Sequence, residues 1–181
     1  MKKEQLGKMI LDSEETMYRV AKTLLRSDAD CADAISESIV KAFSKVHTLR
    51  HDAYAKTWLI RILINECYTL MRREQRLVPL EESAWEEAGR EPEDYSDLYE
   101  ALQALPDKMR VCVTLYYLEG YSVKETAAIL DTTESTVKTR LARARVRLRE
   151  LLEEDGLTDG QEEAGAQKCM NGNRREMGCK A

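Results

Sequence analysis

Residues 122–152 predict two helices joined by a tight turn, with basic side chains concentrated on the second helix. Ser122 followed by Glu125 is the pattern of a capping box, in which each side chain satisfies a backbone N–H at the start of a helix. The run Asp131-Thr132-Thr133 then interrupts the apolar spacing. Thr133 is a second candidate N-cap, and the carboxylate of Glu134 lies at the positive end of the next helix dipole. A short helix, a tight turn and a second helix are typical of a helix-turn-helix.

The second of these helices has an apolar face and a basic face. Apolar side chains recur at spacings of four and three, as expected for a helix that docks on the rest of its domain: Val137, Leu141, Ala144, Leu148 and Leu151. The opposite face carries short polar and basic groups: Thr136, Lys138, Thr139, Arg140, Arg143 and Arg147. A helix in the DNA major groove needs this division, because forked guanidinium and small hydroxyl groups reach base edges and phosphates.

A solvated, arginine-rich surface helix is the simplest alternative explanation of this charge run. Such a helix normally carries acid–base pairs four residues apart, but residues 135–149 contain no Asp or Glu. We therefore favour DNA binding for this element.

The charge of the whole chain is unevenly distributed. The net charge of the 181 residues is −5, which is unusual for a protein that binds DNA on its own. Residues 80–100 hold nine Asp and Glu against Arg90 alone. Together with Pro79 and Pro92, this composition predicts an acidic linker over residues 79–94, because few of its side chains can be buried and proline interrupts helices.

Cysteine spacing and hydropathy indicate the compartment. The five cysteines are scattered and contain no C-x-x-C pair, which suits a reducing environment. No apolar run approaches the roughly twenty residues of a membrane span. We therefore expect a cytoplasmic protein without direct membrane insertion.

Apolar residues at helical spacing predict an all-α protein of two small helical domains, and no strand pattern is found. Residues 1–78 are expected to form a three-helix bundle, whose first helix is capped by Asp12 or Ser13. Residues 95–153 form the second domain, with helices at 96–104 and 106–119 ahead of the helix-turn-helix and Gly120 as a left-handed stop. Residues 154–181 are expected to be a disordered tail.

Three segments in this order resemble the sigma-70 family of bacterial RNA polymerase initiation factors, specifically its small extracytoplasmic-function (ECF) class. They are DADCADAISESIVKAF, TWLIRILINECYTLMRR and LPDKMRVCVTLYYLEGYSVKETAAILDTTESTVKTRLARARVRLR, and the resemblance extends over about residues 13–152. It implies that residues 1–78 correspond to sigma region 2 and residues 95–153 to sigma region 4. The linker is too short for the extra middle domain of the larger housekeeping factors, which favours the ECF class.

The resemblance also implies roles for individual residues. Core RNA polymerase would be bound by Asp33, Ser36, Glu37 and Val40. The melted −10 promoter element would meet the loop from Leu49 to Lys56 and the helix after it, through Tyr54, Lys56, Asn65, Arg72 and Arg73. The duplex −35 element would be read by Thr136, Lys138, Thr139, Arg140 and Arg143. Family members often carry Gln at the position of Ser36 and Asp at that of Thr69, so this chain departs from the usual pattern there.

The resemblance implies further partners. The acidic linker would lie along the RNA exit path of the polymerase, with its carboxylates in place of RNA phosphates, although a solvated tether explains the same composition. An anti-sigma factor would control the protein.

Catalytic chemistry is not expected of this chain. It has no Gly-rich phosphate loop and no nucleophile elbow, and its histidines, His47 and His51, lack a third ligand or a nucleophile nearby. We expect no enzyme activity, cofactor or metal. Two other functions stay open: a dimeric helix-turn-helix regulator that binds a palindromic site alone, and a sigma-like protein that binds polymerase and blocks it.

Overall fold

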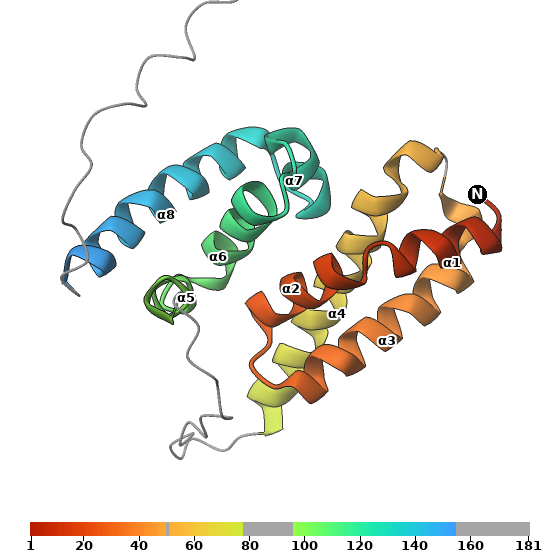
Figure 1. The fold of residues 1–181 in the computed structure, drawn as a ribbon, viewed down its shortest axis with the longest axis horizontal. Coiled ribbons are helices and arrows are strands. Elements are labelled where there is room, and N and C mark those ends of the chain that lie inside the picture. The colour runs from red at the N-terminus through yellow and green to blue at the C-terminus, as the bar shows by residue number, and fades with distance from the viewer. Residues whose placement is uncertain (50, 78–95, 155–181) are drawn as a thin grey trace, which may run out of the picture.

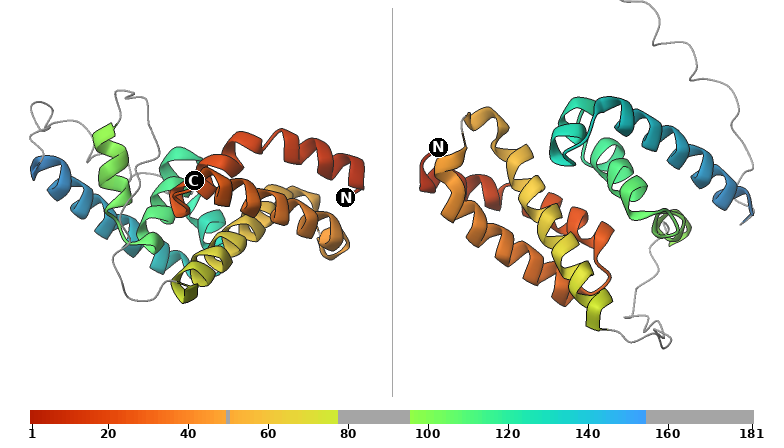
Figure 2. Two further views of the ribbon diagram at one scale, coloured as in Figure 1. Left: turned by 90° about the horizontal axis from the view of Figure 1, so that it is seen from below. Right: turned by 180° about the vertical axis from the view of Figure 1, so that it is seen from behind.

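The computed structural model describes residues 1–49, 51–77 and 96–154, and in these ranges every regular element is helical. Figure 1 shows two groups of helices lying side by side, one from each half of the chain, and the two turned views in Figure 2 agree. The first group is α1 (Lys3–Leu11), α2 (Glu14–Leu24), α3 (Asp28–Lys45) and α4 (Ala55–Leu77). The second group is α5 (Ser96–Gln103), α6 (Asp107–Val113), the π-helix η3 (Thr114–Leu118), α7 (Val123–Ile129) and α8 (Glu134–Glu154).

The expected three-helix bundle is wrong, because α1 adds a fourth helix to the N-terminal group. The backbone N–H of Lys2 donates to the side-chain oxygen of Gln5 at 2.9 Å, which caps the start of α1. Leu6 and Ile10, four residues apart, are its buried positions. The helix was missed because only two core residues stand among charged and small ones, so the apolar stripe is too thin to be recognised.

The N-terminal helices supply most of the main hydrophobic core. Its side chains come from every one of the four helices, and its most deeply buried large members include Leu6, Met17, Leu59, Ile60 and Leu63. Ser13 occupies the N-cap position of α2, as expected. Two short 3-10 turns, η1 (Val46–Thr48) and η2 (Asp52–Tyr54), connect α3 to α4.

In the second group, the single helix expected over residues 106–119 is divided. Pro106 is the N-cap of α6, and the helix widens after Val113 into the π-helix η3, where the N–H of Glu119 donates to the carbonyl of Thr114 at 3.0 Å. Gly120 follows with φ +71°, in the left-handed region that a glycine adopts without strain, and this stop was predicted.

The helix-turn-helix forms as predicted from its caps. Ser122 Oγ accepts from the N–H of Glu125 at 3.2 Å, and the Glu125 carboxylate accepts from the N–H of Ser122 at 2.9 Å, which completes the capping box of α7. Thr133 Oγ1 accepts from the N–H of Thr136 at 3.2 Å and caps α8. In the turn between them, Asp131 takes φ +51°, the one non-glycine residue with positive φ among those described.

The two groups share part of their cores. Val111, Leu115 and Ile129 belong to the second group, yet they are buried in the same apolar cluster as the residues of α1–α4. Helix α2 packs on α6 and η3, and α4 packs on α7. The second group also has a smaller cluster of its own, built on Leu105, Cys112, Val113, Ala127, Val137, Leu141 and Ala144. Helix α6 is therefore buried on two sides, one toward each cluster.

Candidate polymerase and promoter interface

The residues expected to bind core polymerase lie on one exposed face of α3. Asp33, Ser36, Glu37 and Val40 are spaced by three, four and seven residues, which brings them to the same side of a helix, and all four are exposed. Val40 is the unusual member, because a large apolar side chain is 63% exposed. The other face of α3 carries Cys31, Ala34, Ser38 and Ala42 and is buried in the N-terminal core.

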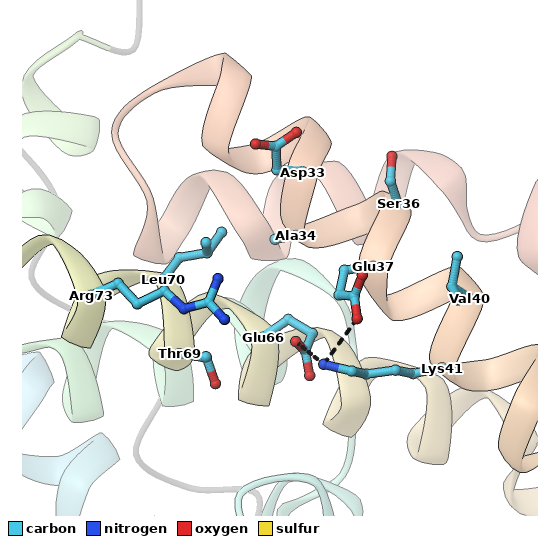
Figure 3. A pocket seen from close by; sticks show the side chains of 10 residues that line it. All are labelled: Asp33, Ala34, Ser36, Glu37, Val40, Lys41, Glu66, Thr69, Leu70 and Arg73. Carbon is cyan, nitrogen blue, oxygen red and sulfur yellow. Dashed lines mark hydrogen bonds and ion pairs between the residues drawn. The ribbon is translucent and has the colours of Figure 1, made fainter.

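This face borders a groove of about 460 Å³ between α3 and α4. Figure 3 shows the ammonium of Lys41 extending to the carboxylates of Glu37 and Glu66, with which it forms ion pairs. The hydrogen bond to Glu66 is the main cause of the raised pKa of Lys41, which stays cationic. Sequence reasoning missed both Lys41 and Glu66. The four-residue spacing of Glu37 and Lys41 could have predicted their ion pair. The pair between Lys41 and Glu66 could not be predicted, because it depends on the packing of α3 on α4.

The residues expected at the −10 element lie along α4 and the turn before it. Tyr54 ends η2 with its side chain 61% exposed and makes an edge contact with His51, with ring centroids 6.2 Å apart. Lys56 lies in the first turn of α4 and is exposed. Asn65, Arg72 and Arg73 are exposed farther along the same helix.

Arg73 differs from the other −10 candidates in its position. It lines the groove that also contains Asp33, Ser36, Glu37 and Val40 (Figure 3). One side chain assigned to DNA thus borders the surface assigned to polymerase. Thr69, the position where the chain departs from the family pattern, lines the same groove and donates its hydroxyl to the carbonyl of Asn65 at 2.8 Å.

Helix α8 divides into the two predicted faces. Val137, Leu141 and Ala144 are buried in the cluster of the second group, and Leu148 packs against it. Lys138, Thr139 and Arg143 are exposed, so three of the five −35 candidates point to solvent. Arg147 pairs with Glu150 at 3.1 Å, an i,i+3 partner just beyond the stretch without acids.

Thr136 and Arg140, the other two −35 candidates, are only half-exposed. Burial raises the pKa of the Cys112 thiol, and a hydrogen bond with Arg140 partly opposes that rise. Burial likewise raises the pKa of Tyr68 on α4, and the charge of Arg140 opposes it. Arg140 therefore lies beside Cys112 of α6, and the outward orientation expected for it is incomplete in this arrangement.

Within the described ranges, no group of three or more His, Cys, Asp or Glu side chains could hold a metal ion. In the same ranges, no helix is both long and apolar enough to cross a bilayer. The expected linker at 79–94 and nearly all of the expected tail at 154–181 lie outside the described residues.

Comparisons with known proteins agree on one family. The family model described as "Sigma-70 region 2" matches residues 9–77, and "Sigma-70, region 4" matches residues 95–148. RNA polymerase sigma factor SigV of Bacillus subtilis is 32% identical over 80% of this chain and 92% of its own length. ECF RNA polymerase sigma factor SigM of Mycobacterium tuberculosis is 35% identical, over 75% of this chain and 71% of its own.

A solved structure is similar as well. The sigma factor RpoE of Bartonella quintana, in complex with the anti-sigma factor NepR, superposes with a TM-score of 0.70 at 29% identity, covering 84% of this chain and 99% of that one. The helices, the two family matches and these relatives lead to one conclusion. The chain belongs to the sigma-70 family, in its extracytoplasmic-function class, and is a sigma factor for promoter-directed initiation of transcription by RNA polymerase.

Proposed function

We propose that the two halves of the chain divide the work of a sigma factor between them. Residues 1–78 bind core polymerase and the −10 element, residues 95–153 bind the −35 element, and residues 79–94 connect them. The observation that carries this proposal is the exposed face of α3, where Asp33, Ser36, Glu37 and the 63%-exposed Val40 lie together. A partner that covers this face would bury the Val40 side chain, and the polar groups around it could pair with groups of that partner.

The promoter contacts follow from the chemistry of the exposed side chains. Tyr54 can stack on an unpaired base of the melted −10 element, and Lys56, Asn65, Arg72 and Arg73 supply cations and an amide along the same helix. Lys138, Thr139 and Arg143 are exposed on α8 and suit major-groove contacts to a duplex −35 element. Thr136 and Arg140, which are half-exposed, complete that set.

Val40→Glu tests the polymerase surface. A carboxylate buried against polymerase without a partner should weaken core binding by about tenfold or more, and run-off transcription should fall in parallel. Leu11→Glu is the matched control, because Leu11 is 72% exposed on α1 and is not one of the residues that line the groove beside the α3 face. Equal polymerase affinity of the two variants would remove the proposed role of the α3 face.

The same run-off assay separates the other functions. A sigma factor adds a promoter-specific transcript to core polymerase, while a protein that only blocks polymerase removes transcripts made with another sigma factor. A dimeric regulator would instead bind a palindromic site without polymerase. We propose that the chain has no catalytic activity, works in the cytoplasm and leaves the chemistry to polymerase.

We also infer that an anti-sigma factor controls the protein. The similar structure from Bartonella quintana is a sigma factor in complex with an anti-sigma factor, and it supports this partner class. A purified candidate must abolish the promoter-specific transcript when added before core polymerase. A candidate that binds the chain but leaves the transcript unchanged would not be an anti-sigma factor.

A further inference from the structure

We propose that the start of α1 extends the promoter-binding surface, and that Lys2 and Lys3 bind phosphates of the melted strand next to the −10 element. This inference rests on the proposed function, because it adds a contact to the proposed −10 surface. The two lysines lie outside the match to sigma-70 region 2, which begins at residue 9.

The first residues of the chain are held in place by the rest of the fold. The side chain of Met1 is only 6% exposed and packs against the main core. The N–H of Lys2 donates to the side chain of Gln5, and Leu6 is buried one turn into α1. The ends of a chain are poorly ordered unless contacts of this kind tie them down. Lys2 and Lys3 therefore project from a fixed point of the structure.

An ion pair places this point beside the proposed −10 surface. The α-amino group of Met1 pairs at 3.0 Å with Oδ1 of Asp52, the first residue of η2. The turn η2 ends at Tyr54, the residue proposed to stack on an unpaired base. Figures 1 and 2 both show the N-terminus beside the connection between α3 and α4. Lys2 and Lys3 directly follow the paired amine, so they lie next to the turn that carries Tyr54.

The ion pair also changes the charge of this surface. The Asp52 side chain is 61% exposed, and an unpaired carboxylate in the turn would repel phosphates. The α-amino group offsets that charge, and Lys2, Lys3 and Lys56 are exposed cations around the turn. In the described part of the chain neither Lys2 nor Lys3 forms an ion pair, although the exposed Glu4 follows them in sequence. The surplus of positive charge fits a phosphate backbone, for which a lysine serves as a point charge.

The proposed stacking identifies the ligand as a nucleic-acid strand. A base that stacks on Tyr54 belongs to a strand with one phosphate per nucleotide, so phosphates must lie close to the turn. Phosphate contacts hold a strand on a protein without reading its bases. Lys2 and Lys3 should therefore raise the affinity for the melted −10 element and leave the preferred −10 sequence unchanged.

The salt dependence of promoter binding measures these contacts. The holoenzyme is bound at increasing salt to fork-junction DNA, which has a melted −10 element and here lacks a −35 element. The affinity tag is at the C-terminus, so that the α-amino group of Met1 stays free. Each phosphate contact to a single strand contributes about 0.7 to the slope of log affinity against log salt concentration.

Lys2→Gln combined with Lys3→Gln should therefore lower the steepness of this slope by about 1.4. Between about 50 and 200 mM salt, the unmodified protein should lose about sevenfold more affinity than the double variant. Both positions are exposed, so the melting temperature of the variant should equal that of the parent.

Lys8→Gln is the matched control for Lys3→Gln, because each removes one exposed cation from α1. Lys8 lies in the last turn of this helix. It is about 8 Å farther along the helix axis than Lys3 and is turned by about 140° from it. Lys3→Gln alone should lower the steepness by about 0.7, whereas Lys8→Gln should leave it unchanged.

Uncharged DNA locates the contact. Methylphosphonates in place of the phosphates next to the melted −10 element remove the charge that the two lysines are proposed to bind. On this DNA the unmodified protein and the double variant should have the same slope. On a duplex that contains the −35 element alone, the two holoenzymes should bind equally, because α1 belongs to the half assigned to the −10 element.

Two results would overturn the proposal. One is a slope that the double variant leaves unchanged, and the other is an equal change from Lys8→Gln and Lys3→Gln. An altered preference among −10 sequences would contradict the assignment to phosphates. If the unmodified holoenzyme failed to prefer the −10 fork junction over a fork junction of random sequence, that result would instead count against the proposed function.

Discussion

The two halves of the molecule differ in how many buried apolar residues each contributes to a hydrophobic core. The N-terminal helices contribute fifteen buried apolar residues to the main cluster, whereas the second group keeps seven in its own cluster and contributes Val111, Leu115 and Ile129 to the main one. A small domain buries too little surface to be very stable alone. The second half thus gains stability from the first, and this dependence is greatest at α6, which faces both clusters.

The proposed contact residues of the two halves also differ in how exposed they are. Every polymerase candidate on α3 and every −10 candidate is exposed in this structure. On α8, by contrast, Thr136 and Arg140 are half-buried. The first half thus presents all of its proposed contact residues to solvent, whereas two of the five on α8 are partly covered.

Arg110→Met should have the largest effect on stability. The substitution keeps the length of the side chain but leaves the Asp107 carboxylate and the Thr23 and Leu105 carbonyls without this donor. We expect the free energy of unfolding to fall by about 3–5 kcal/mol, the usual cost of breaking a buried charged network. Urea denaturation measures it, with exposed Arg143→Met as the control, expected within about 0.5 kcal/mol of the parent. A loss equal to that of the control would end the view that α6 joins the halves.

Leu115→Ala should have the second-largest effect on stability, and it tests whether the two halves share a hydrophobic core. Leu115 is fully buried in the main cluster, so its truncation should cost about 2–5 kcal/mol. Segment-resolved hydrogen exchange should show reduced protection in α2 as well as in α6. Leu141→Ala, in the cluster of the second half, should lower protection in α7 and α8 while α2 is unaffected. Unchanged α2 in both variants would mean that the halves are energetically independent.

Arg140→Ala should affect promoter choice rather than folding. Arg140 is near the start of α8, where side chains reach base edges, so the holoenzyme should lose about 1–3 kcal/mol of binding and change its preference at particular −35 bases. Arg147→Ala should cost less and weaken all promoters alike, because Arg147 lies farther along and is paired with Glu150. Both effects are measured by the affinity of each holoenzyme for a panel of promoters with single changes in the −35 element. Equal, sequence-independent losses would remove the base-reading role of Arg140.

Glu125→Ala should give the smallest effect, and one that depends on pH. Hydrogen bonds with Ser122 lower the pKa of the Glu125 carboxyl below its usual 4.5, so the charged form stabilises the folded state. That stabilisation is present above about pH 4.5 and is lost as the pH falls through the lower, folded-state pKa. Since the carboxylate is largely exposed, we expect less than about 1 kcal/mol.

The urea midpoints of parent and variant should differ at pH 7 and converge near pH 3. Glu125→Gln keeps an acceptor for the N–H of Ser122 but has no charge, so its midpoint should lie between those of the parent and Glu125→Ala at pH 7 and match the parent near pH 3. A difference between parent and Glu125→Ala that is the same at both pH values would show that the charge contributes nothing.

Local signals in the sequence were sufficient for the caps and faces of the helices. Ser122 and Glu125 cap α7, Thr133 caps α8, and Gly120 ends the helix before it. Each of these effects involves groups only a few residues apart, so the sequence alone shows both partners. The apolar stripe of α8 was predicted for the same reason.

Features that depend on contacts between distant segments were not predictable in this way. Helix α1 shows only Leu6 and Ile10 as core positions, and the π-helix at 114–118 leaves no mark on apolar spacing. The groove that joins Lys41 to Glu66 requires α3 and α4 to be packed together first. Only α6 gave an indication of the shared core in the sequence. Its consecutive residues Val111, Cys112 and Val113 place apolar side chains on more than one face of the helix.

The left-handed Asp131 illustrates what a protein engineer would face in this turn. Glycine at that position would relieve the backbone, since an L side chain at φ +51° is disfavoured by about 1 kcal/mol or more. The same change would delete the carboxylate that meets Arg61. A substitution chosen to relieve strain in the turn would therefore also remove an ion pair that joins α8 to α4, so the two effects on stability would oppose each other.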